Sequence, residues 1–184
     1  VINNAGVYKT PDPITRDGLD ARFAVNTIAP YLLTRKLLAL MDSTGRVVNV
    51  SSAAQAAVDP DALAGRIRLD DMEAYAQSKL AITMWSRHLA NEQCGTGPVV
   101  VSVNPGSLLA SKMVQEGFGI DGNDINIGAD ILVRAAVSEE FSQASGQYFD
   151  NDKGQFGPPH PHATDDQRCA ELTDQLDTLL ERLL

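Results

Sequence analysis

Short runs of β-branched residues alternate with long stretches of helical composition along this chain, and this alternation constrains the fold more than any other feature. The clearest runs are residues 46–51, which follow a glycine, and residues 98–103, which have three consecutive valines at their centre. Each run is short, apolar and closed by small or turn-forming residues, as expected for a strand buried on both faces. The long stretches between them predict helices, so the fold class is α/β.

The remaining elements follow from the same patterns. Two further strand segments are expected, at 1–3 and 147–149, and four helices, at about 15–41, 71–93, 127–137 and 165–184. Thr15 is the expected N-cap of the first helix. Polar, proline-containing stretches predict loops at 55–70 and 157–162, and three glycines predict a mobile segment at 107–123. Single helices between strands imply right-handed crossovers and therefore a Rossmann-like, doubly wound parallel sheet covered on both faces.

The length of 184 residues fits one domain or a large part of one. Val1 and Ile2 have the composition of the end of a buried strand rather than of a leader peptide. We therefore expect residues 1–184 to form a single, partial domain whose first βαβ units lie upstream. A chain without those units is expected to be inactive and poorly folded.

Composition excludes several classes of function. The formal charge of −9 and the pI near 4.7 disfavour binding to nucleic acids and to anionic membrane surfaces. No uninterrupted apolar run reaches the roughly 18 residues needed to span a bilayer. Cys94 and Cys169 show neither metal-ligand nor disulfide-scaffold spacing, so we predict no metal site, reduced thiols and a cytoplasmic protein.

Small polar residues and glycines follow each of the first three expected strands. They are Asn4-Ala5-Gly6, Ser51-Ser52 and Pro105-Gly106-Ser107. The carboxyl ends of parallel strands meet at one edge of a sheet, where ligands bind in this architecture. We therefore expect these residues to lie around one site.

Tyr75 and Lys79 are four residues apart on the second long helix, so their side chains share one face. A free phenol titrates near 10, and a nearby ammonium would lower that pKa toward the working range of a general acid or base. Taken alone, such a pair is more often an ordinary helix-surface contact, because pairs with this spacing are common by chance. Ser52, at a strand end, could donate a hydrogen bond to a substrate carbonyl, or could simply cap a helix or loop.

Asn26 lies inside the first helix, four residues before Pro30. Proline has no N–H, so the α-helical partner of the Asn26 carbonyl is missing. One hypothesis is that this carbonyl holds a water that links Lys79 to solvent and reprotonates the tyrosine. The alternative is a helix that is kinked to fit its neighbours.

Five motifs occur in the order and approximate spacing of the short-chain dehydrogenase/reductase family, which residues 1 to about 150 resemble. They are Asn3-Asn4-Ala5-Gly6, Asn26, Val50-Ser51-Ser52, Tyr75-Ala76-Gln77-Ser78-Lys79 and Asn104-Pro105-Gly106. The resemblance implies hydride transfer between NAD or NADP and a small-molecule carbonyl or alcohol. It implies Tyr75 as acid/base, Lys79 as its pKa modulator and ribose ligand, Ser52 as carbonyl ligand and Asn26 as relay residue. Cofactor contacts would come from Asn4, Ala5, Gly6, Pro105, Gly106 and Ser107.

The chain departs from the family pattern in three ways. No glycine-rich phosphate turn follows a strand, because Gly117, Gly119 and Gly122 neither follow a strand nor open a nearby helix. The 22 residues between Ser52 and Tyr75 resemble the longer spacing of the retinol-dehydrogenase-like branch. Ala110 stands where the family often has a cofactor-binding threonine, with Ser111 next to it.

Two expectations concern surfaces. Apolar residues at 108–118 would cover the substrate pocket as a lid over an apolar substrate, or would pack as ordinary core. Leu80 and Met84 lie opposite Tyr75 on their helix, so another surface must cover them, and the resemblance implies a homodimer or homotetramer. A non-catalytic dinucleotide-binding or interaction protein on the same fold is the alternative to an enzyme.

Overall fold

The computed structural model describes residues 1–184 as an α/β fold around one five-stranded sheet. Along the sheet the strands follow chain order: β1 (Ile2–Asn3), β2 (Arg46–Val50), β3 (Val99–Asn104), β4 (Tyr148–Asp150) and β5 (Gln155–Phe156). The first four strands are parallel, and β5 pairs antiparallel with β4. The Rossmann-like α/β fold class is confirmed, with β5 as a strand that the sequence patterns did not predict.

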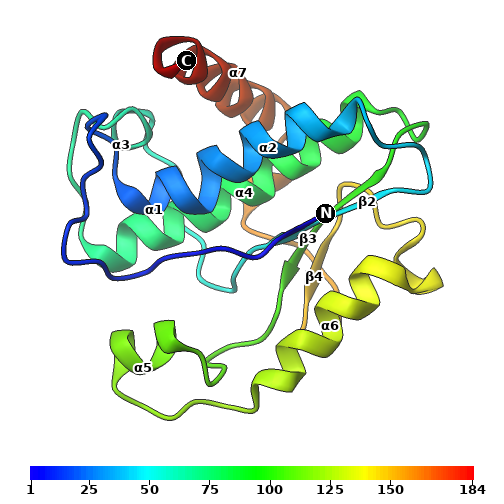
Figure 1. The fold of residues 1–184 in the computed structure, drawn as a ribbon. Helices are drawn as coiled ribbons and strands as arrows, with labels where there is room; N and C mark the ends of the chain where they lie inside the picture. Colours follow the sequence, from blue (N-terminus) through cyan, green and yellow to red (C-terminus); the bar gives the residue numbers. More distant parts are fainter.

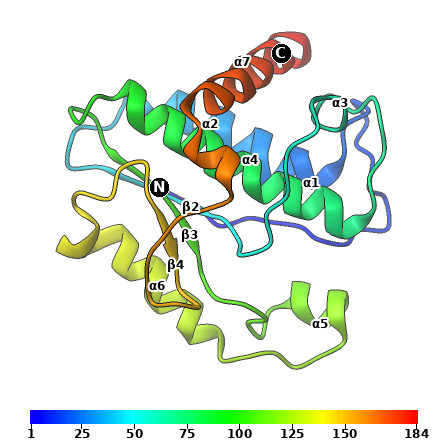
Figure 2. The ribbon, with the colours of Figure 1, turned by 180° about the vertical axis from the view of Figure 1, so that it is seen from behind.

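Helices cover both faces of the sheet (Figure 1). One face carries α1 (Ala21–Phe23), a π-helical turn (Ala24–Ile28), α2 (Ala29–Leu38) and α4 (Asp71–Glu92), with α7 (Asp166–Leu183) outside them. The opposite face carries α6 (Ile125–Val137), as the reverse view in Figure 2 also shows. Shorter elements are α3 (Pro60–Leu63), α5 (Lys112–Phe118) and two 3₁₀ turns, Glu139–Phe141 and Pro161–Thr164.

The helix α4 closely matches its expected range because its ends are encoded locally. Asp70 caps it by accepting a hydrogen bond from the Glu73 N–H at 2.8 Å, and Asp71 and Glu73 place negative charge near the helix N-terminus. Residues from Ala74 to Leu89 are buried at most positions, because β3 lies on one side of the helix and α7 on another. This double coverage fixes the axis of the helix that carries Tyr75 and Lys79.

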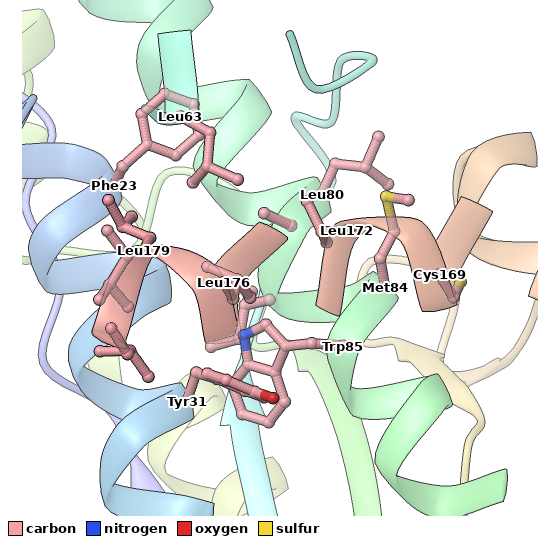
Figure 3. Packing of buried hydrophobic residues seen from close by; sticks show 14 of the residues in the cluster. Phe23, Tyr31, Leu63, Leu80, Met84, Trp85, Cys169, Leu172, Leu176 and Leu179 are labelled. Atoms are coloured by element: carbon pink, nitrogen blue, oxygen red, sulfur yellow. The ribbon is translucent and has the colours of Figure 1, made fainter. Parts of the chain in front are cut away.

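The largest apolar cluster lies between α4, α2 and α7 rather than against the sheet. Figure 3 shows the Trp85 indole beside the Tyr31 ring, with Leu176 of α7 next to them. The two ring centroids are 5.6 Å apart in an edge-on arrangement. Leu80 and Met84 are buried in the same cluster, at 0% and 4% exposure. The surface that covers Leu80 and Met84 is therefore α7 of the same chain, and the homodimer or homotetramer stays a prediction.

The first long helix differs from its expected range of 15–41. It begins at Ala21 with Asp20 as its N-cap, and Thr15 instead accepts a hydrogen bond from the Leu19 N–H within a turn. The prolines at 11 and 13 and the positive φ of Gly18 keep the preceding segment out of helical geometry. The helix then widens into the π-helical turn just before Pro30, as the missing proline N–H allows.

The segment 107–123 is more ordered than the glycines predicted. Ser111 caps α5 through a hydrogen bond from the Val114 N–H, and Gly119 ends the helix in a left-handed conformation at φ 68°. A short helix, α3, likewise forms inside the stretch expected to be a loop at 55–70. None of the helices of the chain has both the length and the apolar character needed to cross a bilayer.

Candidate active site

The residues that follow the first three strands line one cavity of about 1090 Å³ at the carboxyl edge of the sheet, as expected. Its lining contains Tyr75 and Lys79 of α4 together with Asn4, Ala5, Gly6, Ser51, Ser52, Asn104, Pro105, Gly106 and Ser107. A smaller cavity of about 360 Å³ between α3 and α7 is lined by none of these residues. The structure therefore gathers every candidate site residue except Asn26 around a single space.

Lys79 is 3% exposed, yet its side chain reaches the cavity. Its Nζ donates one hydrogen bond to the Val50 carbonyl at 2.8 Å and lies 5.7 Å from the centroid of the Tyr75 ring. An ammonium has three donors, so two remain for a ligand. The one-turn spacing on α4 thus places the phenol and the ammonium on the same wall of the cavity.

Burial moves the two pKa values in directions that the sequence did not predict. Desolvation lowers the pKa of Lys79 from 10.5 to about 8. Desolvation also raises the pKa of Tyr75 above its usual value, and the Ser52 hydroxyl partly opposes this shift. The expectation that Lys79 lowers the Tyr75 pKa is therefore wrong for the protein alone, because desolvation of the phenolate is the largest effect. Tyr75 is a protonated acid at neutral pH.

Hydrogen bonds to the backbone carbonyl of Ser52 hold this residue in place, and Ser52 lines the cavity. The Ser52 carbonyl accepts hydrogen bonds from the Tyr148 hydroxyl and from Gln55 Nε2, each at 3.0 Å. The Ser52 Oγ accepts from the Ala54 N–H at 3.1 Å. Since this contact uses only an acceptor lone pair, the Ser52 proton can still be donated to another group. Tyr148, 96 residues away in sequence, carried no signal that linked it to the site.

Asn26 lies behind the cavity wall and is 1% exposed. Its side-chain amide pairs with the backbone of Val7, accepting from Val7 N–H at 2.8 Å and donating to Val7 O at 2.9 Å. It also donates to Ser78 Oγ at 2.9 Å, which ties the loop after β1 to α4. This arrangement gives Asn26 a positioning role that the sequence did not reveal. The water relay through the Asn26 carbonyl stays a prediction.

The Pro105–Ser107 turn is held by two carboxylates, Asp150 at the end of β4 and Asp152 just after it. Asp152 accepts from the Ser107 N–H at 2.8 Å and from the Ser107 hydroxyl at 2.6 Å. Asn104 Nδ2 donates to both Asp150 and Asp152, at 3.0 and 2.9 Å. Hydrogen bonds from Ser107 and Asn104 help to hold the pKa of Asp152 below its usual range against the effect of burial. The turn at the cavity edge is thus fixed by residues that sequence analysis missed.

Two departures from the family pattern have a structural outcome. Gly117, Gly119 and Gly122 lie in the last turn of α5 and directly after it, so they follow no strand and open no phosphate-binding helix. Ser111 lines the cavity, but its Oγ is the N-cap acceptor of α5. This contact uses only an acceptor lone pair, so the Ser111 proton can still be donated, whereas Ala110, at the position where the family often has threonine, has no hydroxyl.

Comparison with known proteins agrees with this geometry. The family described as short chain dehydrogenase matches residues 1–118. Human retinol dehydrogenase 13 is 32% identical over 94% of this chain and 57% of its own length. Mouse retinol dehydrogenase 12 is 33% identical over 83% of this chain and 52% of its own length. The chain therefore spans about half the length of the curated relatives it matches.

Solved structures show the same fold. An uncharacterized protein from Mycobacterium paratuberculosis matches 98% of this chain and 66% of its own, at a TM-score of 0.76 and 24% identity. Landomycin C-6 ketoreductase LanV, solved with bound NADP and rabelomycin, matches 83% of this chain and 59% of its own, at a TM-score of 0.58 and 28% identity. With the family match over residues 1–118 and the strand-end site in place, the chain belongs to the short-chain dehydrogenase family.

Proposed function

We propose that the protein carrying this chain is an NAD- or NADP-dependent oxidoreductase that interconverts a carbonyl and an alcohol. The observation that supports this most is the convergence of Tyr75, Lys79 and Ser52 on one cavity at the carboxyl ends of β2 and β3. A purely structural Tyr–Lys pair would have no need of a lysine that is 3% exposed and has two donors free. The alternative is a dinucleotide-binding or interaction protein without catalysis.

The residues present fit the nicotinamide and ribose end of such a cofactor. The free Lys79 donors can bind ribose hydroxyls. A Cβ on Gly6 would come within 3.5 Å of Lys79 Nζ and 3.4 Å of Asn26 Oδ1, so the missing side chain keeps this corner open. Pro105 and Gly106 form the opposite edge of the cavity. When bound there, the cofactor supplies or accepts the hydride.

Side chains of this chain would supply the proton that the substrate oxygen takes up. Tyr75, whose raised pKa keeps it protonated, donates its phenolic proton to the oxygen of the substrate carbonyl. Ser52 donates a hydrogen bond to the same oxygen and so polarises the carbonyl. Lys79 carries positive charge near the phenolate that forms, because its pKa is about 8. Asn26 bonds both the loop after β1 and Ser78 of α4, and so helps to hold α4, which carries Tyr75 and Lys79, in place.

Tyr75→Phe tests this proposal in the native full-length protein. Removing one hydroxyl should lower kcat by at least about a hundredfold, because general acid catalysis contributes about that much or more. Binding of NAD or NADP, measured by calorimetry, should change little. Tyr31→Phe is the matched control, since the Tyr31 hydroxyl bonds Asp177 on α7. Unchanged turnover in Tyr75→Phe would favour the non-catalytic alternative.

A further inference from the structure

Tyr8 occupies an unusual place in the loop between β1 and α1. It is 8% exposed, and it lines the same cavity as Tyr75. The Tyr8 and Tyr75 ring centroids are 5.4 Å apart and meet edge to face at 69°. On another side, the Tyr8 ring stacks on Phe118 of α5 at 5.4 Å and 13°. Tyr8, Tyr75 and Phe118 together form what we call the aromatic wall.

The position of Tyr8 is fixed from behind by polar contacts. Asn26 pairs with both backbone groups of Val7, the preceding residue. The Tyr8 carbonyl accepts a hydrogen bond from Arg22 Nη1 at 3.4 Å. Arg22 is itself 1% exposed and is held by ion pairs with Asp20 and Asp71. Tyr8 is therefore part of a rigid support that extends from α1 to the first turn of α4.

The end of α5 is shaped to accept the Tyr8 ring. A Cβ on Gly117 would lie 2.7 Å from Tyr8 Cδ1 and 2.8 Å from Cε1, so only glycine permits this approach. The Gly117 carbonyl also accepts a hydrogen bond from Lys9 Nζ at 3.2 Å. The contact between α5 and the loop after β1 consequently depends on the stacked rings of Tyr8 and Phe118 and on the absence of a side chain at Gly117.

Several other side chains that line the cavity are flexible or aliphatic. They are Met72, Leu108, Leu109, Met113 and Val114. Methionine adapts its shape to a ligand, whereas aromatic rings offer a rigid flat surface at little entropic cost. The cavity lining thus combines aromatic rings that pack on one another with aliphatic and methionine side chains that can adjust to a ligand.

We propose that Tyr8 is a positioning and specificity-determining residue of this site: it holds the Tyr75 ring, joins that ring to α5, and makes the cavity select flat apolar carbonyl compounds. The proposal rests on the oxidoreductase function proposed above. Loss of the Tyr8 ring would free both Tyr75 and Phe118 at once. Turnover would then fall most for substrates that pack against the aromatic wall.

The test compares two diketones with the same reacting group, phenanthrenequinone, which is flat and aromatic, and diacetyl, which is small and aliphatic. In the native full-length protein, Tyr8→Ala should lower the ratio of kcat/KM for phenanthrenequinone over diacetyl by about tenfold, as expected for the loss of one or two aromatic contacts. Tyr8→Phe keeps the ring and should stay within about twofold of wild type. KM for phenanthrenequinone should rise in Tyr8→Ala, and kcat should fall for both diketones because Tyr75 is less well placed.

Gly117→Ala provides a second route that leaves Tyr8 intact. Alanine favours a helix, so this change should not unfold α5, but its Cβ would displace the Tyr8 ring. It should lower the same ratio, whereas Gly157→Ala, whose Cβ would meet nothing within 4 Å, should not. If Tyr8→Ala fails to fold, Gly117→Ala decides the question.

The outcomes separate this inference from the function on which it rests. An unchanged diketone ratio in Gly117→Ala, or in folded Tyr8→Ala, overturns the role of Tyr8 even where Tyr75→Phe is inactive. Equal loss in Tyr8→Phe and Tyr8→Ala would also overturn it, since the hydroxyl rather than the ring would then matter. Calorimetric binding of phenanthrenequinone no tighter than that of diacetyl overturns it without any measurement of turnover.

Discussion

At the scale of single residues, burial rather than charge pairing decides the acid–base properties of the site. The spacing of Tyr75 and Lys79 was sufficient to place both on one wall, because i and i+4 share a helix face whatever surrounds them. The pKa directions were not predictable, since they depend on how far folding removes each group from water, and for Tyr75 also on the Ser52 hydroxyl and the Tyr8 phenol. The roles of Tyr8 and Asp152 were also not predictable, because their partners, Phe118 and Ser107, lie far away in sequence.

The lowered pKa of Lys79 predicts how stability depends on pH. The unfolded chain binds a proton at this group up to about pH 10.5, whereas the folded protein releases it near pH 8. The unfolded state thus holds more protons between these values, so Lys79 makes the free energy of unfolding rise with pH across this window. Below pH 8 the full cost of burying the charge is present, on the order of 3 kcal/mol.

Lys79→Met removes this titration and keeps an unbranched side chain. Relative to this variant, wild type should gain stability between pH 8 and pH 10, as measured by urea unfolding. Lys112→Met, at a lysine whose side chain is 85% exposed, should show no such trend. A difference between wild type and Lys79→Met that is constant with pH would contradict the burial argument.

At the scale of elements, the helices and strands whose ends are marked by capping or turn residues were predicted well. Those whose ends depend on contacts with other parts of the fold were not. Asp70 begins α4, and β2 and β3 are valine-rich runs that end at small or turn-forming residues. Thr15 offered an equally plausible cap, but Pro13 and Gly18 hold the chain in a turn until Asp20. The helix α5 escaped prediction because Gly117 packs against Tyr8 inside the helix and Gly119 ends it, so the glycines do not prevent helix formation.

Asp70→Ala tests the cap of the helix that carries the site. Loss of the hydrogen bond to the Glu73 N–H should lower the free energy of unfolding by about 1 kcal/mol. Chemical denaturation measures this loss, with Asp121→Ala in an exposed loop as the control. Equal stability of the two variants would mean that α4 is held by packing alone.

At the scale of the whole molecule, α7 covers the apolar face of α4 and α2 that lies away from the sheet. Its amphipathic sequence predicted a terminal helix but not its partner, since many apolar surfaces could accept it. In the fold it lies across α4 and α2, where Leu176 is completely buried beside Trp85. The face assigned to a second subunit is thereby filled within one chain.

Leu176→Ala should therefore lower the free energy of unfolding by about 2–5 kcal/mol, because it leaves a cavity between α7 and α4. Leu184→Ala, at a position that is 83% exposed, should change it by less than about 0.5 kcal/mol. Thermal or urea unfolding measures both. Similar stability of the two variants would show that α7 does not pack as described.

The sequence by itself determined the fold class, the order of the four parallel strands and the long helices, and the set of residues at the strand ends. These follow from hydrophobic periodicity and from the rule that parallel strands present their carboxyl ends at one edge. Only the tertiary structure decided which groups lose their water, which ring lies against Tyr75 and what covers α4. Those properties depend on contacts between residues distant in sequence, such as Tyr8 with Phe118 and Trp85 with Leu176, and local patterns carry no record of such contacts.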